Sequence, residues 1–128
     1  MTSLLILSHS PKIAEGAKEF ALQMTGENCI IAIGGTKTGT FGTDYDRTLA
    51  EMKKAAEQGE VIVLADIGSA RLTGQMAREA LDDSLRENVF LSDAALVEGA
   101  LIAAIAIAAN QNAKEILFQL QEYLLPKD

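Results

Sequence analysis

The fold of this chain is decided near its start by Leu4-Leu5-Ile6-Leu7-Ser8-His9-Ser10-Pro11. Four consecutive aliphatic residues are typical of a strand buried on both faces, and the polar residues after them mark where the strand leaves its sheet. Ser10 can cap a helix that begins at Pro11, since proline suits the first helical position. His9, the only histidine, is therefore expected at a strand end beside a helix N-terminus, which attracts anions.

Three more apolar runs follow, and together the four runs predict the fold class. They span residues 29–33, 61–65 and 89–91, and a glycine or a polar residue follows each of them. Apolar residues at helical spacing fill the intervals, and strands that alternate with helices form parallel sheets. We predict an α/β fold of one domain (1–128), a doubly wound three-layer sandwich. About four parallel strands in the order 2-1-3-4 should carry helices on both faces.

The apolar spacing also predicts which face of each helix is buried. In the helix after Pro11, which should end at Gly26, this face comprises Ile13, Ala17, Phe20 and Met24. In the helix after Ser69 it comprises Leu72, Met76 and Ala80. Thr43 is expected to cap the second helix, and the final helix should run through Leu124.

The segment 100–109 is aliphatic on all sides, which is more than a helix with one buried face requires. A domain of this size has a limited interior, and soluble monomers seldom expose large apolar patches. We therefore predict a homodimer whose interface covers part of this helix. The expected interface residues are Leu101, Ile102, Ile105 and Ile107.

Composition and charge argue against several classes of protein. The formal net charge is −7, and no cluster of Lys or Arg could neutralise a nucleic-acid backbone. No apolar run reaches the ~20 residues of a membrane span, and the start lacks the basic region of a signal peptide. The single Cys29 is expected to be a buried thiol. We predict a cytoplasmic protein with no nucleic-acid or membrane partner and no metal site.

Asp66 directly follows the third expected strand, at the sheet edge where His9 follows the first. In the order 2-1-3-4 these strands are neighbours, and ligands bind at the switch point between them. The carboxylate could accept a hydrogen bond from one imidazole nitrogen and leave the other as a nucleophile, which suits a phosphoryl carrier. A helix cap near Ser69 is an alternative role for Asp66, and the two roles are compatible.

Four segments resemble the phosphotransfer subunits (DhaM) of bacterial PTS-dependent dihydroxyacetone kinases. They are Ser8-His9-Ser10, the glycine- and threonine-rich segment 34–43, Asp66-Ile67-Gly68-Ser69-Ala70 and Leu96-Val97-Glu98-Gly99. The resemblance covers nearly the whole chain. In combination, the motifs distinguish this family from the mannose-type sugar IIA components, which share its fold and histidine and are the alternative within the superfamily.

The resemblance implies that His9 is transiently phosphorylated by the carrier protein HPr, with phosphoenolpyruvate as the ultimate donor. His9 would return the phosphoryl group to ADP on a partner subunit, which then serves dihydroxyacetone on a third subunit. Asp66 would orient His9. The resemblance implies no cofactor in this chain, because ADP and Mg²⁺ belong to the partner. The residues expected around the phosphoryl oxygens are Ser10, Gly35, Thr36 and Ser69.

Two features depart from the family's usual pattern. Some members continue into fused carrier and enzyme I domains, whereas this chain spans one domain and is expected to use separate donor proteins. The family's proline before Leu96-Val97-Glu98-Gly99 is Ala95 here, a change that touches none of the proposed chemistry.

Two other small doubly wound folds carry different chemistry. A receiver domain accepts phosphate on an aspartate placed as Asp66 is, but it needs an acidic Mg²⁺ site where this chain has Ser8-His9-Ser10. A flavodoxin-like module binds phosphate after its first strand, and this chain has no Trp and only two Tyr to stack on a flavin. A scaffold without any phosphorylated form is the remaining alternative.

Overall fold

The structure is a computed structural model that describes residues 2–25 and 29–127. Its centre is one sheet of four parallel strands in the order β2-β1-β3-β4. The strands are β1 (Thr2–Ser8), β2 (Ile30–Gly34), β3 (Glu60–Ala65) and β4 (Val89–Ser92). The predicted strand order is thus confirmed, whereas the helix end expected at Gly26 lies outside the described residues.

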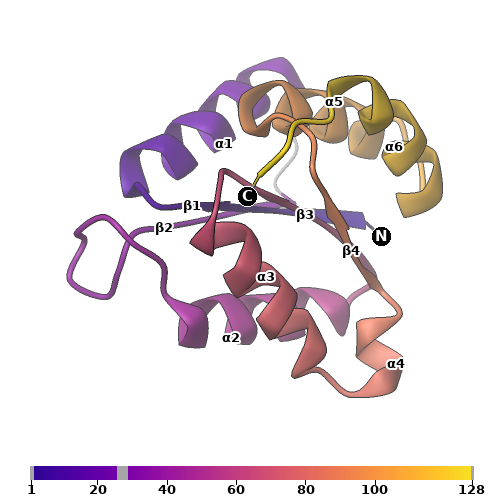
Figure 1. Ribbon diagram of the computed structural model, residues 1–128. Coiled ribbons are helices and arrows are strands. Elements are labelled where there is room, and N and C mark those ends of the chain that lie inside the picture. The colour runs from indigo at the N-terminus through magenta and orange to yellow at the C-terminus, as the bar shows by residue number, and fades with distance from the viewer. Residues whose placement is uncertain (1, 26–28, 128) are drawn as a thin grey trace.

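Helices cover both faces of the sheet, which confirms the predicted three-layer sandwich (Figure 1). One face carries α1 (Pro11–Thr25), α5 (Leu96–Ala108) and α6 (Ala113–Leu120). The other carries α2 (Tyr45–Ala56), α3 (Ser69–Glu79) and the short α4 (Asp83–Arg86). A turn of 3₁₀ helix, η1 (Gln121–Tyr123), follows α6. None of the helices described is long and apolar enough to cross a membrane.

The aliphatic run in β1 fills both layers between sheet and helices. Leu4 and Ile6 point into the layer under α1, α5 and α6, and Leu5 and Leu7 point into the layer against α2 and α3. All four side chains are at most 2% exposed. Burying such a side chain contributes about 1.5–3 kcal/mol, so this strand anchors both halves of the core.

The buried face of α1 is the face of its small residues, which corrects the prediction. Its core side chains are Ala14, Ala17 and Ala21. Of the predicted stripe only Ala17 is buried, because Ile13, Phe20 and Met24 are 50%, 46% and 59% exposed. The reason is close packing: α1 lies against β2 and α5, and the buried residues of α5 are also mostly alanine. Short distances between elements admit small side chains only.

Helix α3 requires the same correction. The predicted Leu72 and Met76 are 54% and 52% exposed, and Ala80 lies beyond the last helical residue. The residues that are buried instead are Ala70, Thr73, Gly74 and Ala77. A Cβ added at Gly74 would lie 3.1 Å from Leu7 Cδ1, which shows how closely the helix backbone approaches the sheet.

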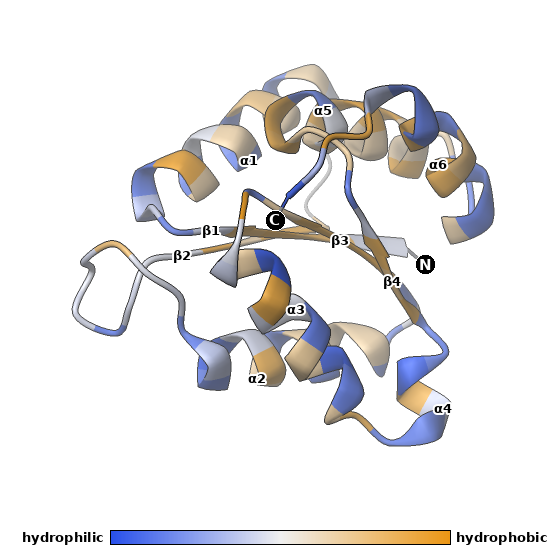
Figure 2. Ribbon diagram, in the orientation of Figure 1, coloured by the Kyte–Doolittle hydropathy of each residue, from blue (hydrophilic) through white to orange (hydrophobic). Residues whose placement is uncertain are grey.

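Packing within the chain covers most of α5, which Figure 2 shows as a largely hydrophobic helix. Of the residues predicted for a dimer interface, Ile107 is buried, Leu101 and Ile102 are half-buried, and Ile105 is 45% exposed. Much of the apolar surface of α5 is therefore buried against other parts of the same chain. The homodimer stays a prediction.

Two expectations about helix ends were wrong. The N-cap of α2 is Asp44 rather than Thr43, and its carboxylate accepts the backbone N–H of Arg47 at 3.1 Å. The hydroxyl of Thr43 instead lies 3.0 Å from that of Thr73 on α3. Leu124 lies in an extended conformation beyond the end of α6 and is 54% exposed.

The strands leave the sheet along one edge, and Gly34 draws the end of β2 close to the start of α1. A Cβ added at Gly34 would lie 2.4 Å from the backbone oxygen of Ser10 and 2.7 Å from Pro11 Cα. Because both of these atoms belong to the backbone, no side chain could move aside to make room. The glycine therefore fixes the position of the chain that carries His9.

Replacing Gly34 by alanine should destabilise the fold by about 1–3 kcal/mol, the usual cost of overpacking. The matched control is Gly16→Ala in α1, where an added Cβ meets no described atom within 4 Å. That control should gain roughly 0.5–1 kcal/mol, because alanine is the better helix former. Urea denaturation measures both changes, and equal stabilities of the two variants would contradict the close contact at Gly34.

Candidate active site

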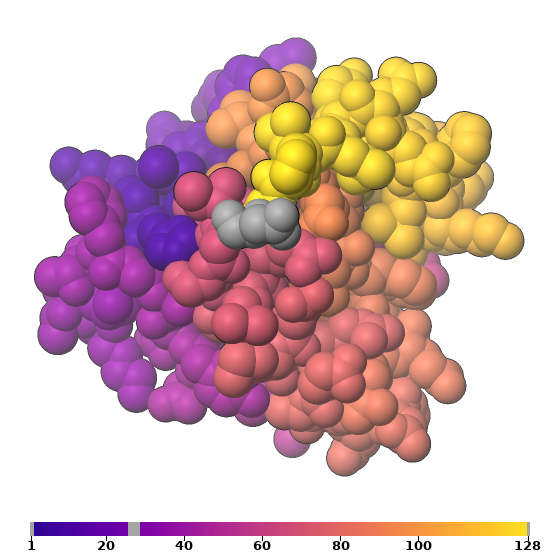
Figure 3. All heavy atoms as spheres, in the orientation of Figure 1, coloured from indigo at the N-terminus to yellow at the C-terminus, as the bar shows by residue number. Residues whose placement is uncertain are grey.

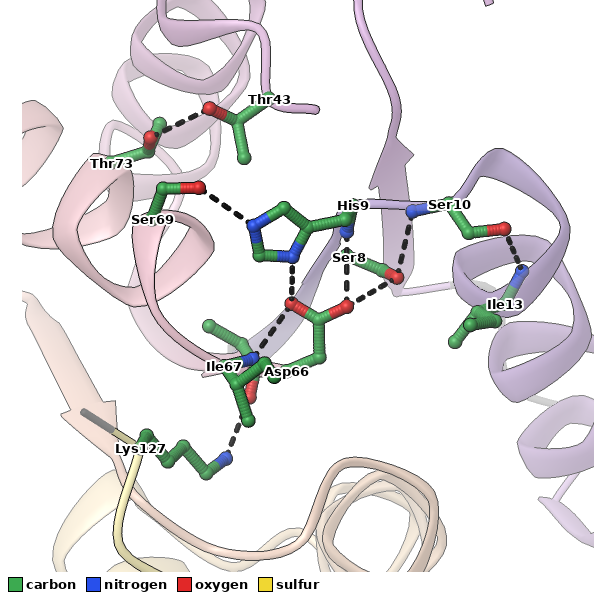
Figure 4. Close-up of polar contacts among 11 residues, drawn as sticks. Ser8, His9, Ser10, Ile13, Thr43, Asp66, Ile67, Ser69, Thr73 and Lys127 are labelled. Atoms are coloured by element: carbon green, nitrogen blue, oxygen red, sulfur yellow. Dashed lines mark hydrogen bonds and ion pairs between the residues drawn. The ribbon is translucent and has the colours of Figure 1, made fainter. Parts of the chain in front are cut away.

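A cluster of polar side chains lies where β1 and β3 leave the sheet (Figure 4). Ser8 is the last residue of β1, His9 follows it, and Asp66 directly follows β3. The expected contact between His9 and Asp66 is present, with ring Nδ1 2.8 Å from carboxylate Oδ1. The two side chains meet because their strands are neighbours and end at the same level.

The carboxylate of Asp66 takes part in four hydrogen bonds. Oδ2 accepts the Ser8 hydroxyl at 2.7 Å and the backbone N–H of His9 at 3.0 Å. Oδ1 accepts the backbone N–H of Ile67 at 2.8 Å and faces the His9 ring. Burial by itself would raise the pKa of this carboxyl, but the bonds from His9 and Ser8 outweigh it and lower the pKa. Asp66 is therefore a fixed anion beside the ring.

Both nitrogens of the His9 ring have a partner. Because an ionised carboxylate can only accept, the Nδ1 that faces Asp66 carries the proton of the neutral ring. Nε2 then holds the lone pair and accepts the hydroxyl of Ser69, whose Oγ lies 2.6 Å away. Ser69 is the first residue of α3. The His9 side chain is 31% exposed, so an incoming group can reach Nε2 when the hydroxyl moves aside.

The other residues predicted around a phosphoryl group have backbone N–H groups that are used within the protein. The N–H of Ser10 donates to the Ser8 hydroxyl, and that of Gly35 donates to the Ser8 carbonyl. The N–H of Thr36 donates across its own loop. Of the four predicted residues, Ser69 is the one whose side chain contacts the ring. The phosphoryl contacts of the other three stay predictions.

Sequence reasoning missed two residues of this cluster. The Ser8 hydroxyl joins Asp66 to the backbone of Ser10, and its only sequence signal is its place in the Ser8-His9-Ser10 motif. Lys127 comes from far along the chain, and its buried ammonium group donates to the Ala65 carbonyl at 2.6 Å. Lys127 follows Leu124-Leu125 by two residues, and no pattern in this stretch predicts that its side chain reaches the edge where the strands leave the sheet.

The arrangement suits nucleophilic attack by Nε2. A carboxylate on Nδ1 fixes the tautomer and stabilises the positive charge that the ring gains when Nε2 forms a bond. Within the described residues, no three His, Cys, Asp or Glu side chains gather into a potential metal site. Cys29 is buried in the core, as predicted, and lies outside this cluster.

Comparison with known proteins agrees with this chemistry. The family model described as PTS system fructose IIA component matches residues 3–117. A Listeria innocua protein named PEP-dependent dihydroxyacetone kinase 2, phosphoryl donor subunit DhaM, is 37% identical over 121 residues, which cover 94% of this chain and 97% of that protein. This chain belongs to the DhaM family.

Other relatives show how the family varies in length. The Lactococcus lactis PTS-dependent dihydroxyacetone kinase, phosphotransferase subunit DhaM, is 31% identical, with 97% of each chain covered. The Escherichia coli DhaM is 33% identical, but the match covers 99% of this chain and only 28% of that protein. A crystal structure of a protein of unknown function is 35% identical, covers 94% of this chain and 92% of its own, and superimposes with a TM-score of 0.85.

Ala95, which stands where the DhaM resemblance leads one to expect proline, makes a contact that proline could not. Its φ of −53° lies within the range of proline. Its backbone N–H, however, donates to the carbonyl of Tyr123 at 2.7 Å. The loop therefore keeps a backbone shape that proline would fit, while the alanine ties it to the segment after α6.

The lowered pKa of Asp66 predicts how stability depends on pH. A carboxyl whose pKa is lower in the folded state contributes stability above its unfolded pKa of ~3.9 and loses it as the pH falls through the folded value. Unfolding free energy should therefore fall more steeply below about pH 4 in the wild type than in Asp66→Asn. Urea denaturation across this range measures both slopes.

The matched control for that experiment is Asp82→Asn, which removes an exposed carboxylate before α4. This control should keep the steep acid dependence of the wild type. Parallel curves for the wild type and Asp66→Asn would show that the hydrogen bonds of Asp66 do not favour its ionised form.

Proposed function

We propose that this chain is a phosphohistidine carrier. His9 accepts a phosphoryl group from HPr, and ultimately from phosphoenolpyruvate, and passes it to ADP bound on the partner subunit of a dihydroxyacetone kinase. The observation that carries the proposal is the pair of ring contacts: Asp66 on Nδ1 leaves the lone pair on Nε2, where only the Ser69 hydroxyl has to move aside for attack. The relatives named as phosphoryl donor subunits support the same role.

In this chain the chemistry requires only the His9 ring and the Asp66 carboxylate. The lone pair of Nε2 forms a bond to phosphorus as the bond from phosphorus to the donor breaks, and the proton on Nδ1 stays between the ring and Asp66. The ring becomes cationic in this step, and the adjacent carboxylate stabilises that charge. In the return step an oxygen of ADP attacks phosphorus, the N–P bond breaks, and the neutral ring is restored.

Ser69 has a different part in the two states of the carrier. In the unmodified protein its hydroxyl donates to Nε2, so it must rotate away before Nε2 can attack phosphorus. It is then placed to donate to a phosphoryl oxygen, since Oγ starts 2.6 Å from the atom that takes up phosphorus.

The proposal assigns the remaining components to other chains. ADP and its Mg²⁺ belong to the partner subunit, and HPr is a separate donor protein in the cytoplasm. The Escherichia coli relative is more than three times as long as its matched segment. We also propose that the carrier is a homodimer that covers Ile105.

Incubation with phosphoenolpyruvate, enzyme I and HPr should add one phosphoryl group to the wild type, visible in the intact mass. The label should be lost in acid and kept in alkali, as for phosphohistidine, and should be absent from His9→Ala. It should be discharged by an ADP-binding kinase subunit. Persistent labelling of His9→Ala would overturn the assignment, and discharge onto a sugar-specific transfer component alone would favour the mannose-type alternative.

Asp66→Asn should still be phosphorylated on His9, but about 10²-fold more slowly, because an amide no longer fixes the reactive tautomer. Ser69→Ala keeps Asp66 and its tautomer, so it should lose less rate than Asp66→Asn. Rapid-quench measurements of labelling compare the two variants. Phosphate found on Asp66 itself would contradict the carrier mechanism and support a receiver domain.

A further inference from the structure

The segment after η1 lies across the ends of β3 and β4 and is hydrogen-bonded to the residues at both ends. Its last described residue, Lys127, is only 6% exposed, and its ammonium group donates to the carbonyls of Ala65 and Ala94. The backbone N–H of Leu125 donates to the carbonyl of Asp93 at 2.9 Å. Figure 3 shows the yellow C-terminal part of the chain beside pink and orange atoms from earlier parts of the chain.

Lys127 also holds the turn that leads into α3. Its own carbonyl accepts the backbone N–H of Gly68 at 3.0 Å. Gly68 is the N-cap of α3, has a φ of +55° and gives the helix no side-chain cap. The start of α3 is therefore held from outside by Lys127 instead of by a capping side chain.

We propose that Lys127 is a positioning residue for the phosphoryl site. Its ammonium group donates to the carbonyl of Ala65, the residue before Asp66. Its carbonyl accepts the backbone N–H of Gly68, the residue before Ser69. The two partners of the His9 ring are thus held through their immediate neighbours. Figure 4 shows Lys127 approaching this turn from the side opposite His9. The kinetic part of the proposal rests on the proposed function, whereas the geometric part does not.

An ammonium group is needed here because two carbonyls must be satisfied at once. The end of a parallel strand leaves carbonyls without a partner on the next strand, and a buried carbonyl without a hydrogen bond destabilises the fold. One amine with three donors bridges Ala65 and Ala94, which belong to different strand exits. A side chain without donors would leave both carbonyls unpaired and free the turn to shift.

Two nearby carboxylates partly offset the cost of burying this cation. Burial lowers the pKa of Lys127, and the carboxylates of Asp93 and Asp66 raise it by less, so that with Arg71 also lowering it the pKa stays below its ordinary value. Asp93 is itself paired with Arg71, whose guanidinium donates to both carboxylate oxygens. The ammonium group therefore lies among anionic and carbonyl oxygens at both strand exits.

The test compares wild type, Lys127→Met and the control Lys53→Met, which removes an exposed lysine of α2. Thermal unfolding first selects variants that fold, and Lys127→Gln replaces Lys127→Met if the latter does not. Nitrogen NMR of the His9 ring then reports its tautomer without any partner protein. We expect one tautomer, protonated at Nδ1, in wild type and Lys53→Met, and a mixture of tautomers in Lys127→Met.

Phosphorylation by HPr supplies the second readout. Lys127→Met should still be labelled fully on His9, but between about 10- and 100-fold more slowly, the scale of small misplacements near a reacting atom. Lys127→Arg keeps the charge and the donors and should retain more of the rate. Equal losses in the Met and Arg variants would show that the charge and the hydrogen-bond donors at this position do not sustain the rate, and would overturn the proposal.

Two further outcomes separate this inference from the proposed function. If folded Lys127→Met has the ring spectrum and labelling rate of wild type, or is slower with an unchanged spectrum, Lys127 does not act through the partners of His9. If the wild type itself is not labelled, the carrier function fails, while the ring spectra still decide whether Lys127 positions Asp66.

Discussion

The site depends on the parallel pairing of β1 with β3. Leu7 lies opposite Ala65 in this pairing, so the two strands leave the sheet at the same level. His9 comes directly after Ser8, the last residue of β1, and Asp66 comes directly after β3. Their contact therefore needs no long loop. The aliphatic side chains of both strands fill the layers above and below and fix this register, because a slip of one residue would reverse every side chain.

The carboxylate at this junction shows which physical effect dominates the site. Removing an ion from water costs several kcal/mol, and a charge-assisted hydrogen bond returns about 1.5–3 kcal/mol. Asp66 is only partly buried and receives donors on both oxygens, from Ser8, His9 and Ile67. Hydrogen bonding therefore exceeds desolvation, and the group stays ionised and immobile. An anion of this kind can support a ring that alternates between neutral and cationic states.

The faces of the helices show where hydrophobic patterning fails as a guide. Patterning gives the greatest weight to large side chains, so it favours the faces of α1 and α3 that carry Phe20 and Met76. In the structure these faces are half exposed, and alanine, threonine and glycine face the sheet. The distance between helix and sheet decides which face is buried, and no local pattern contains that distance.

The sequence by itself determined the α/β class, the strand order and the meeting of His9 with Asp66. The class follows from aliphatic runs that alternate with helical spacing, and the order 2-1-3-4, which brings His9 to Asp66, is the common one for a short doubly wound chain. Only the tertiary structure decided that Ser69 hydrogen-bonds Nε2 of His9. The same holds for Lys127, which bonds to the turn between β3 and α3. These side-chain contacts join residues 60 and 62 positions apart in the chain, and they arise where strand exits and helix starts converge in space, which no periodicity along the sequence encodes.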